Sequence, residues 1–194
     1  METNMNLMRG FSELSNMESR SISPENPDGS KSGGAKAVPS LSEGAARELG
    51  KGWKVQPCHG IEAEATHVLA DYKGEGIIKQ IWITLSGNWR MHVIRFYWDG
   101  EAKPSVEVPL GDFFCSGWNK YSPLVSIPVC VNPGSAFNCY WEMPFRKGFR
   151  ITVENLSLER STIFYQINFE VGKIPANSCY FHAQFRRSNP LPYK

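Results

Sequence analysis

The sequence has no run of about 18 apolar residues, the length that a membrane-spanning helix needs. Its N-terminus has no basic segment followed by an apolar run, so it shows no secretory signal. It also has no long block of like charge, and its formal net charge is only +2. Such a surface predicts neither nucleic acid nor an acidic membrane as a partner. We therefore expect a cytoplasmic protein.

The five cysteines are odd in number and include no CxxC pair, which argues against a disulfide framework and against a zinc site. Reduced thiols in a reducing compartment fit the chain better. The histidines are not spaced as metal ligands, and Gly33-Gly34 is too short for a phosphate-binding loop. We expect no metal ion and no other cofactor.

The chain divides into two parts of different composition. Residues 1–54 are polar and rich in Ser, Gly and Asn, which predicts an irregular N-terminal arm. Within it, residues 41–49 could form a short helix capped by Ser40 or Ser42. Hydrophobic residues make up 41% of the chain, enough for a sizeable core, and we place that core in a domain over residues 55–194.

Strand-like runs with turn residues between them fill the second part. The clearest is 161–171, where Ile163, Tyr165 and Ile167 share one face with Phe169 and Val171. Asp99-Gly100 supplies a turn that tolerates positive φ. The expected strands are 79–85, 91–98, 105–109, 124–131, 138–143, 150–155, 161–171 and 179–187. Such spacing predicts an antiparallel sandwich or barrel, and the pattern alone leaves a jelly roll, an immunoglobulin-like sandwich and a barrel open.

Four segments, in this order along the chain, resemble glycoside hydrolase family 172, which was first catalogued as domain of unknown function 2961. The first is residues 20–29, with Pro24-Glu25-Asn26-Pro27, and it leads into 33–36. The second is 96–100, followed by 104–114 with Leu110-Gly111-Asp112-Phe113-Phe114. The third is 137–147, with Tyr140-Trp141-Glu142, and the fourth is 180–187. The resemblance covers residues 20–190. It implies an all-β fold, an antiparallel jelly-roll sandwich that is the first roll of a double jelly roll.

Members of this family assemble as trimers or hexamers and need no organic cofactor. They hydrolyse furanosides, such as α-D-fructofuranosides, difructose dianhydride and D-arabinofuranosides, with retention through two glutamates. Those glutamates lie in the second roll, in a Glu-Gly-Asp segment and a Gly-Thr-Glu-Asp-Tyr segment, and neither segment occurs in residues 1–194. We therefore assign no catalytic residue here and expect a front half that is inactive alone. The Pro-rich residues 188–194 are expected to connect to the missing roll.

Two places could still contribute to sugar binding. Glu142 lies beside Trp141, and an aromatic ring next to a carboxylate suits a sugar, although core packing is the favoured interpretation of Trp141. Ser23, Glu25 and Asn26 belong to an irregular Pro-flanked loop, the kind of segment that often carries binding residues, although a turn or an inter-subunit strap would explain them too.

A third candidate is Asp112 with Phe113, a carboxylate at a strand end beside two aromatic residues, which could meet a sugar or anchor a loop. Glu107, Glu154 and Glu170 lie on polar strand faces and are expected to point to solvent. Two other functions remain open: a capsid-like assembly module without catalysis, and a lectin-like carbohydrate-binding jelly roll.

Overall fold

A computed structural model describes residues 14–39 and 44–192 of the chain. They form two stacked sheets. In hydrogen-bonding order, one sheet is β1-β12-β4-β9-β8-β7, with β10 on β4 and β2 on β12, and the other is β13-β6-β5-β11-β3. The strands are β1 Glu18–Ile22, β2 His59–Ile61, β3 Thr66–Lys73, β4 Gly76–Leu85, β5 His92–Trp98, β6 Val106–Pro109, β7 Leu124–Val125, β8 Val129–Val131, β9 Phe137–Cys139, β10 Met143–Phe145, β11 Gly148–Asn155, β12 Ser161–Val171 and β13 Ala183–Gln184.

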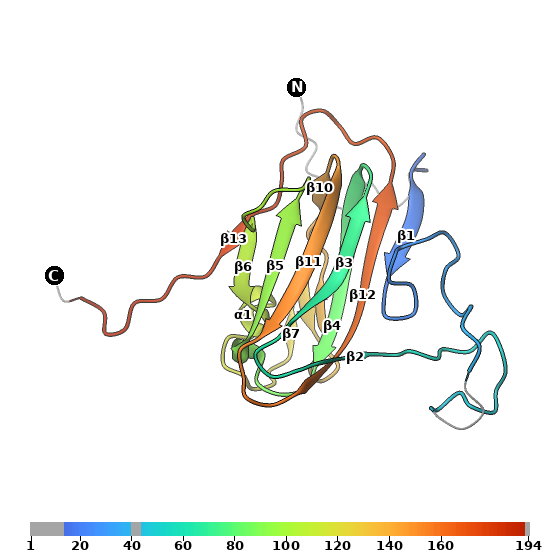
Figure 1. Cartoon of the computed structure of the whole chain (residues 1–194). Helices are drawn as coiled ribbons and strands as arrows, with labels where there is room; N and C mark the ends of the chain where they lie inside the picture. The colour runs from blue at the N-terminus through green and yellow to red at the C-terminus, as the bar shows by residue number, and fades with distance from the viewer. Residues whose placement is uncertain (1–13, 40–43, 193–194) are drawn as a thin grey trace.

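The strand order confirms the predicted jelly roll. The rows β1-β12-β4-β9 and β3-β11-β5-β6 interleave strands from both ends of the chain, as the two Greek keys of a jelly roll do. Figure 1 shows the second row facing the viewer, with β12 and β1 to its right. All pairs are antiparallel except β13 with β6.

The core lies between the sheets and is rich in aromatic residues. In β12 every second side chain from Ile163 to Phe169 is buried, as the alternation predicts. The largest fully buried side chains include Phe96, Trp98, Phe114, Phe137, Phe145, Tyr165 and Phe169. Several meet edge to face, such as Phe149 and Phe169 with ring centroids 5.4 Å apart. Such pairs add about 0.5–1.5 kcal/mol each beyond their burial.

The predicted turn at Asp99-Gly100 is confirmed, with φ of 54° and 86°. Its carboxylate also joins a second turn, because Oδ1 of Asp99 accepts the backbone N–H groups of Arg146, Lys147 and Gly148 at 2.9, 2.6 and 3.1 Å. Burial would raise the pKa of Asp99, but these bonds and one from the Tyr180 hydroxyl outweigh it and lower the pKa. The β5–β6 and β10–β11 turns are therefore held together by one ionised side chain.

The N-terminal arm differs from its expected irregular form. It contributes β1, which pairs with β12 from Glu18 opposite Val171 to Ile22 opposite Ile167. The predicted helix at 41–49 is wrong for its described part, since residues 44–49 form successive turns, and residues 41–43 lie outside the described residues. The short helix of the described chain is α1, Leu110–Phe113, and it follows β6 directly.

Three expected strands are shorter or divided. The run 124–131 forms a hairpin of β7 and β8 in which Ser126 N–H donates to the Val129 carbonyl. The run 138–143 lies across β9 and β10, with a connecting segment between them. In place of 179–187, only β13 is a strand, and the chain after it extends away from the sandwich (Figure 1).

Candidate functional site

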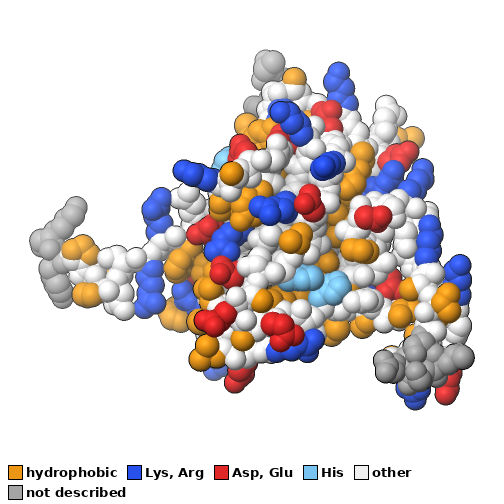
Figure 2. Space-filling view, viewed as in Figure 1, with side chains coloured by type: hydrophobic (Ala, Val, Ile, Leu, Met, Phe, Trp, Pro, Cys, Tyr) orange, Lys and Arg blue, Asp and Glu red, His pale blue; other side chains and the backbone are white. Residues whose placement is uncertain are grey.

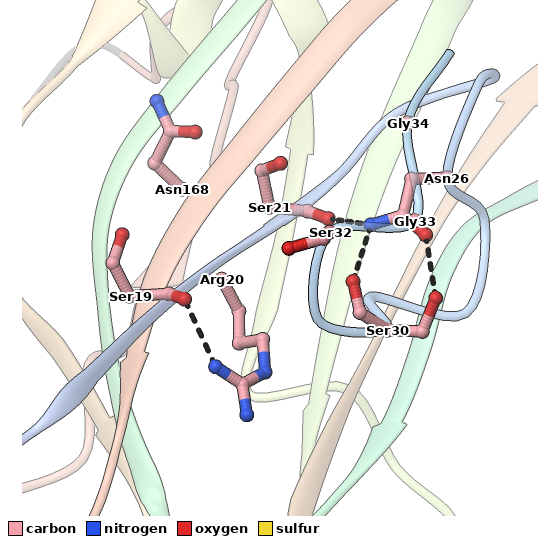
Figure 3. Close-up of a pocket in the computed structure, with 9 residues that line it drawn as sticks. All are labelled: Ser19, Arg20, Ser21, Asn26, Ser30, Ser32, Gly33, Gly34 and Asn168. Atoms are coloured by element: carbon pink, nitrogen blue, oxygen red, sulfur yellow. Dashed lines mark hydrogen bonds between the residues drawn. The ribbon is translucent and has the colours of Figure 1, made fainter. Parts of the chain in front are cut away.

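The loop after β1 forms one wall of a polar pocket of about 240 Å³. Ser21 and Asn168 are register partners on β1 and β12, and the loop folds back beside them (Figure 3). The lining is almost all hydroxyl, amide and backbone, with one cation, Arg20. The residues are Ser19, Arg20, Ser21, Asn26, Ser30, Ser32, Gly33, Gly34 and Asn168. This composition suits a neutral hydroxylated ligand better than an apolar one.

Asn26 is the residue that shapes the loop. Its Nδ2 donates to the carbonyls of Ser21 and Ser30 at 2.9 and 3.0 Å, and its Oδ1 accepts from Ser30 Oγ at 3.1 Å (Figure 3). A carboxamide has two N–H donors and one acceptor oxygen, so both donors and one lone pair are engaged. Asn26, predicted as a binding residue, lines the pocket, and its amide also holds the pocket wall in place.

Ser23 and Glu25, the other predicted residues of this loop, do not line the pocket. Ser23 Oγ accepts the Glu25 N–H at 3.3 Å, a local turn contact. The Glu25 carboxylate accepts the backbone N–H groups of Val55 and Gln56 at 2.8 and 2.7 Å. Glu25 thus fastens the loop to the segment that leads into β2.

Asn168 begins a chain of side-chain amides on the outer face of the larger sheet. Its Nδ2 donates to Gln80 Oε1 at 2.8 Å, and its Oδ1 accepts from Gln166 Nε2 at 2.8 Å. Gln80 Nε2 in turn lies 3.4 Å from Asn138 Oδ1 and 3.4 Å from the Tyr140 hydroxyl. We call Gln80, Asn138, Gln166 and Asn168 the amide network, which crosses β12, β4 and β9.

The sequence analysis selected no residue of this network as a binding residue. The alternation in 161–171 does leave Gln166 and Asn168 on the face opposite Ile163 and Ile167. In β4, buried Ile81 and Ile83 alternate with Gln80, Trp82 and Thr84. This alternation could have indicated from the sequence that β4 contributes side chains to the same outer face. The pairing of β4 with both β12 and β9 is a tertiary fact that a single sequence does not give.

Trp141 and Glu142 lie in the segment between β9 and β10, directly after Tyr140. The core-packing interpretation of Trp141 is wrong, because its side chain is 48% exposed. Its ring lies 6.2 Å from that of Phe181, on the C-terminal segment. Glu142 is exposed and forms an ion pair with Lys79. The alternative interpretation, a ring and a carboxylate open to a ligand, is compatible with this geometry.

Asp112 and Phe113 lie on α1, which packs against β5 and β6 of the smaller sheet. The Phe113 ring lies 6.3 Å from that of Phe181, which is also the neighbour of Trp141. Phe113 is half-buried, with its ring 5.3 Å from that of Phe96. Asp112 Oδ2 is buried, lies 3.5 Å from Arg90 Nε, and has no hydrogen bond among the described residues. Burial raises the pKa of Asp112, against the opposing effect of Arg90. This pair therefore anchors α1 to the segment before β5.

Of the remaining candidate glutamates, Glu107 and Glu154 form ion pairs, whereas Glu170 is half-buried near the end of β12. Arg95 lies between Glu107 and Glu154, at 3.0 Å and 2.6 Å, on the outer face of the smaller sheet. Glu107 is exposed, as expected, whereas the ion pair leaves Glu154 partly covered. No three His, Cys, Asp or Glu side chains in residues 14–39 and 44–192 are grouped so that they could hold a metal ion. Within the same ranges no helix has the length and apolar character to cross a membrane.

Comparison with known families decides what this sandwich is. Residues 50–174 match the model of the GH172 first beta-sandwich domain. The chain belongs to the GH172 family. The GH172 match runs from before β2 to the end of β12, so it includes the amide network, whereas β1 and the pocket loop precede it. The pocket is thus made jointly by the GH172 sandwich, through Asn168, and by the arm. No curated protein matches the chain.

Proposed function

We propose that this chain is the first, non-catalytic sandwich of a retaining GH172 glycoside hydrolase that acts on furanosides, such as α-D-fructofuranosides, difructose dianhydride or D-arabinofuranosides. The observation that carries the proposal is the GH172 match over residues 50–174. In this proposal the nucleophile and the acid/base come from the second sandwich of the family. The reaction needs two carboxyl groups and water, so the proposal includes no organic cofactor.

The engagement of the carboxylates here supports a non-catalytic role. A retaining glycosidase needs two carboxyl groups about 5–5.5 Å apart, one of them a proton donor with a raised pKa. Asp112 has a raised pKa, but its ionic partner is the guanidinium of Arg90 and not a second carboxylate. Glu107 and Glu154 share one arginine, and Glu142 has Lys79. These groups stabilise the fold, which leaves the chemistry to residues elsewhere.

The test compares the 194-residue chain alone with the chain joined to a GH172 second sandwich that carries both glutamate segments. The substrates are 4-nitrophenyl α-D-arabinofuranoside and the corresponding fructofuranoside. The chain alone is expected to release no nitrophenol, whereas the joined protein should release it with retention, seen by NMR of the first-formed sugar. Replacing both second-sandwich glutamates with glutamine is the matched control. Release by the chain alone would contradict the proposal.

A role in assembly is supported by exposed apolar side chains around β7. Trp118, Val125 and Ile127 are 90%, 78% and 73% exposed. Such a group of side chains commonly marks a surface that another protein covers. We infer that it contacts a further copy or the second sandwich in a homotrimer or hexamer. Light scattering after size-exclusion chromatography should show a trimer or hexamer of the joined protein, and a monomer would argue against this role.

We also infer a cytoplasmic location for the protein. All five cysteines are unpaired, although Cys115 and Cys179 are exposed. Free exposed thiols fit a reducing compartment, because oxidising compartments favour disulfides. Fractionation of cells that express the natural gene tests the location, and its recovery in a secreted fraction would contradict the inference.

A further inference from the structure

The outer face of the larger sheet carries a continuous row of side chains that the proposed function does not use. The register places Trp82 between Gln166 on one side and Asn138 on the other, so three strands contribute to the row. Across the sheet, the register partner of Asn138 is Cys130 on β8, and the partner of Cys130 is Val125 on β7. In β4 the row is possible because Ile81, Ile83 and Leu85 face the core, leaving Gln80, Trp82 and Thr84 on the outside.

The amide network keeps unused hydrogen-bonding capacity on this face. Each carboxamide has two N–H donors and an oxygen with two lone pairs. In Asn168, one N–H and one lone pair serve Gln80 and Gln166, so a second donor and a second lone pair remain. The network fixes the amide orientations in advance, which reduces the conformational entropy lost on binding. Adjacent fixed donors and acceptors match hydroxyl groups, each of which both donates and accepts.

Trp82 and Tyr140 add aromatic surface to the row. Trp82 is half-buried in the middle of the network, and the Tyr140 hydroxyl ends it at Gln80. The C–H faces of sugar rings are apolar and pack against aromatic rings, while their hydroxyl edges meet amides. The pocket beside Asn168 extends the same chemistry, with four serine residues in its lining.

The two outer faces differ in charge. On the smaller sheet, Arg95, Glu107 and Glu154 form ion pairs, and Arg150 lies 4.2 Å from the centre of the Tyr97 ring. Figure 2 shows Lys, Arg, Asp and Glu side chains mixed over that face. The amide network itself carries no charge. Two of the cations beside it are paired, Lys79 with Glu142 and Arg20, in the pocket lining, with Glu18, while Glu170 lies near the end of β12. A charged ligand would find no counter-charge along the row.

We propose that the amide network, Trp82 and the pocket at Asn26 form a binding surface for a neutral glycan chain. The occupant is a carbohydrate because the amide network is uncharged, the pocket's one cation, Arg20, is paired with Glu18, and the surface combines adjacent donors and acceptors with an aromatic ring. The surface would hold a polymeric substrate near the catalytic sandwich without taking part in bond cleavage. The inference does not depend on which linkage the enzyme cleaves.

The test is glycan titration of the 194-residue chain, followed by ¹H–¹⁵N NMR of the Asn, Gln and Trp side chains and by calorimetry. The probes are inulin oligosaccharides, arabinan oligosaccharides and cello-oligosaccharides. The expected result is saturable binding of at least one probe, with shifts of the Trp82 indole and network amides. Gln166→Ala combined with Asn168→Ala should raise the Kd at least tenfold. Gln184→Ala, an exposed amide on β13, is the matched control and should leave the Kd unchanged.

The outcomes are separable from those of the furanosidase test. Binding of cello-oligosaccharides alone supports the glycan surface and counts against furanosides as its ligand. Three results would overturn the inference: no probe binds, the shifts map to the Tyr97 face, or the double variant binds as well as the parent. Self-association that the double variant abolishes would also overturn it, because a second copy would then occupy the face. The NMR spectrum of each variant verifies that it is folded.

Discussion

The Oε1 atom of Glu25 accepts the backbone N–H of Val55 at 2.8 Å and so joins two segments that lie 30 residues apart in the chain. The other carboxylate oxygen accepts from Gln56. Hydrogen bonds to an ionised group contribute more than neutral ones. Glu25→Gln is therefore expected to lower the free energy of unfolding by about 1–2 kcal/mol in urea denaturation. Glycan binding by the folded variant should remain, and a loss of binding at unchanged stability would instead make Glu25 a ligand contact.

The matched control is Glu48→Gln, an exposed glutamate in the same arm. Its substitution should change the stability by less than about 0.5 kcal/mol, as for most surface positions. Equal losses for both variants would contradict the specific contribution of the Glu25 bonds.

Two adjacent glycines give a sharper test of the pocket loop. A Cβ atom on Gly33 would lie 2.0 Å from Asn26 Oδ1 and 2.4 Å from Ser30 Oγ, whereas one on Gly34 would meet nothing within 4 Å. Gly33→Ala must displace the Asn26 amide and should cost about 1–3 kcal/mol. Gly34→Ala should stay within about 0.5 kcal/mol of the parent. Thermal unfolding measures both, and equal behaviour of the two variants would contradict the described loop.

The stability of the fold should depend on pH through its histidines. Burial lowers the pKa of His59, His67 and His92 from the ordinary value of 6.5. His59 also lowers that of His67, and the bond to Asn88 partly opposes burial at His92. Below pH 6.5 the unfolded chain binds protons that the folded chain does not, so stability falls as the pH drops from 6.5 toward the lowered values. The slope is at most about 1.4 kcal/mol per pH unit for each histidine.

Urea unfolding between pH 7.5 and 5.5 measures this slope. His67→Gln should reduce it, while His182→Gln, at an exposed position after β12, should not. A midpoint that does not move between pH 7.5 and 5.5 would contradict the lowered pKa values of these imidazoles.

The thiols should differ in reactivity in the native protein. Burial raises the pKa of Cys139 to about 12, so its reactive thiolate form is suppressed. Cys115 and Cys179 are exposed. A chromogenic disulfide reagent is expected to label these two first and to reach Cys139 only after unfolding. Rapid labelling of Cys139 in the folded chain, located by mass spectrometry, would show that β9 opens readily.

Sequence reasoning succeeded where local pattern and tertiary packing agree. The alternation in β12 is regular, and therefore predictable, because this strand lies between β1 and β4 and keeps one face on the core along its whole length. It failed at β3, where Leu69 and Ala70 are both buried next to a bulge in the pairing with β11 and so break the alternation. It also missed β1, whose five residues include one buried apolar side chain, Ile22.

The candidate site was harder to predict for the same physical reason. The sequence left Glu25 open between a binding residue and a turn or strap, because no local pattern links it to its hydrogen-bond partners Val55 and Gln56. Trp141 looked like a core residue because its neighbours Cys139 and Met143 are buried, but the segment between them is not a strand. The amide network needs the register of three strands, and only the folded chain supplies it.

The pairing of β1 with β12 has a consequence for how the chain is made. β1 is synthesised before the other described strands, but its hydrogen-bonding partner β12 is the twelfth of the thirteen. Contacts between residues so far apart form slowly, because the chain entropy of closing the loop opposes them. Until β12 has been synthesised, β1 lacks its hydrogen-bonding partner strand, and the polar pocket lacks Asn168. The pocket is thus complete only after β12 has been synthesised, although the loop that forms its wall directly follows the first described strand.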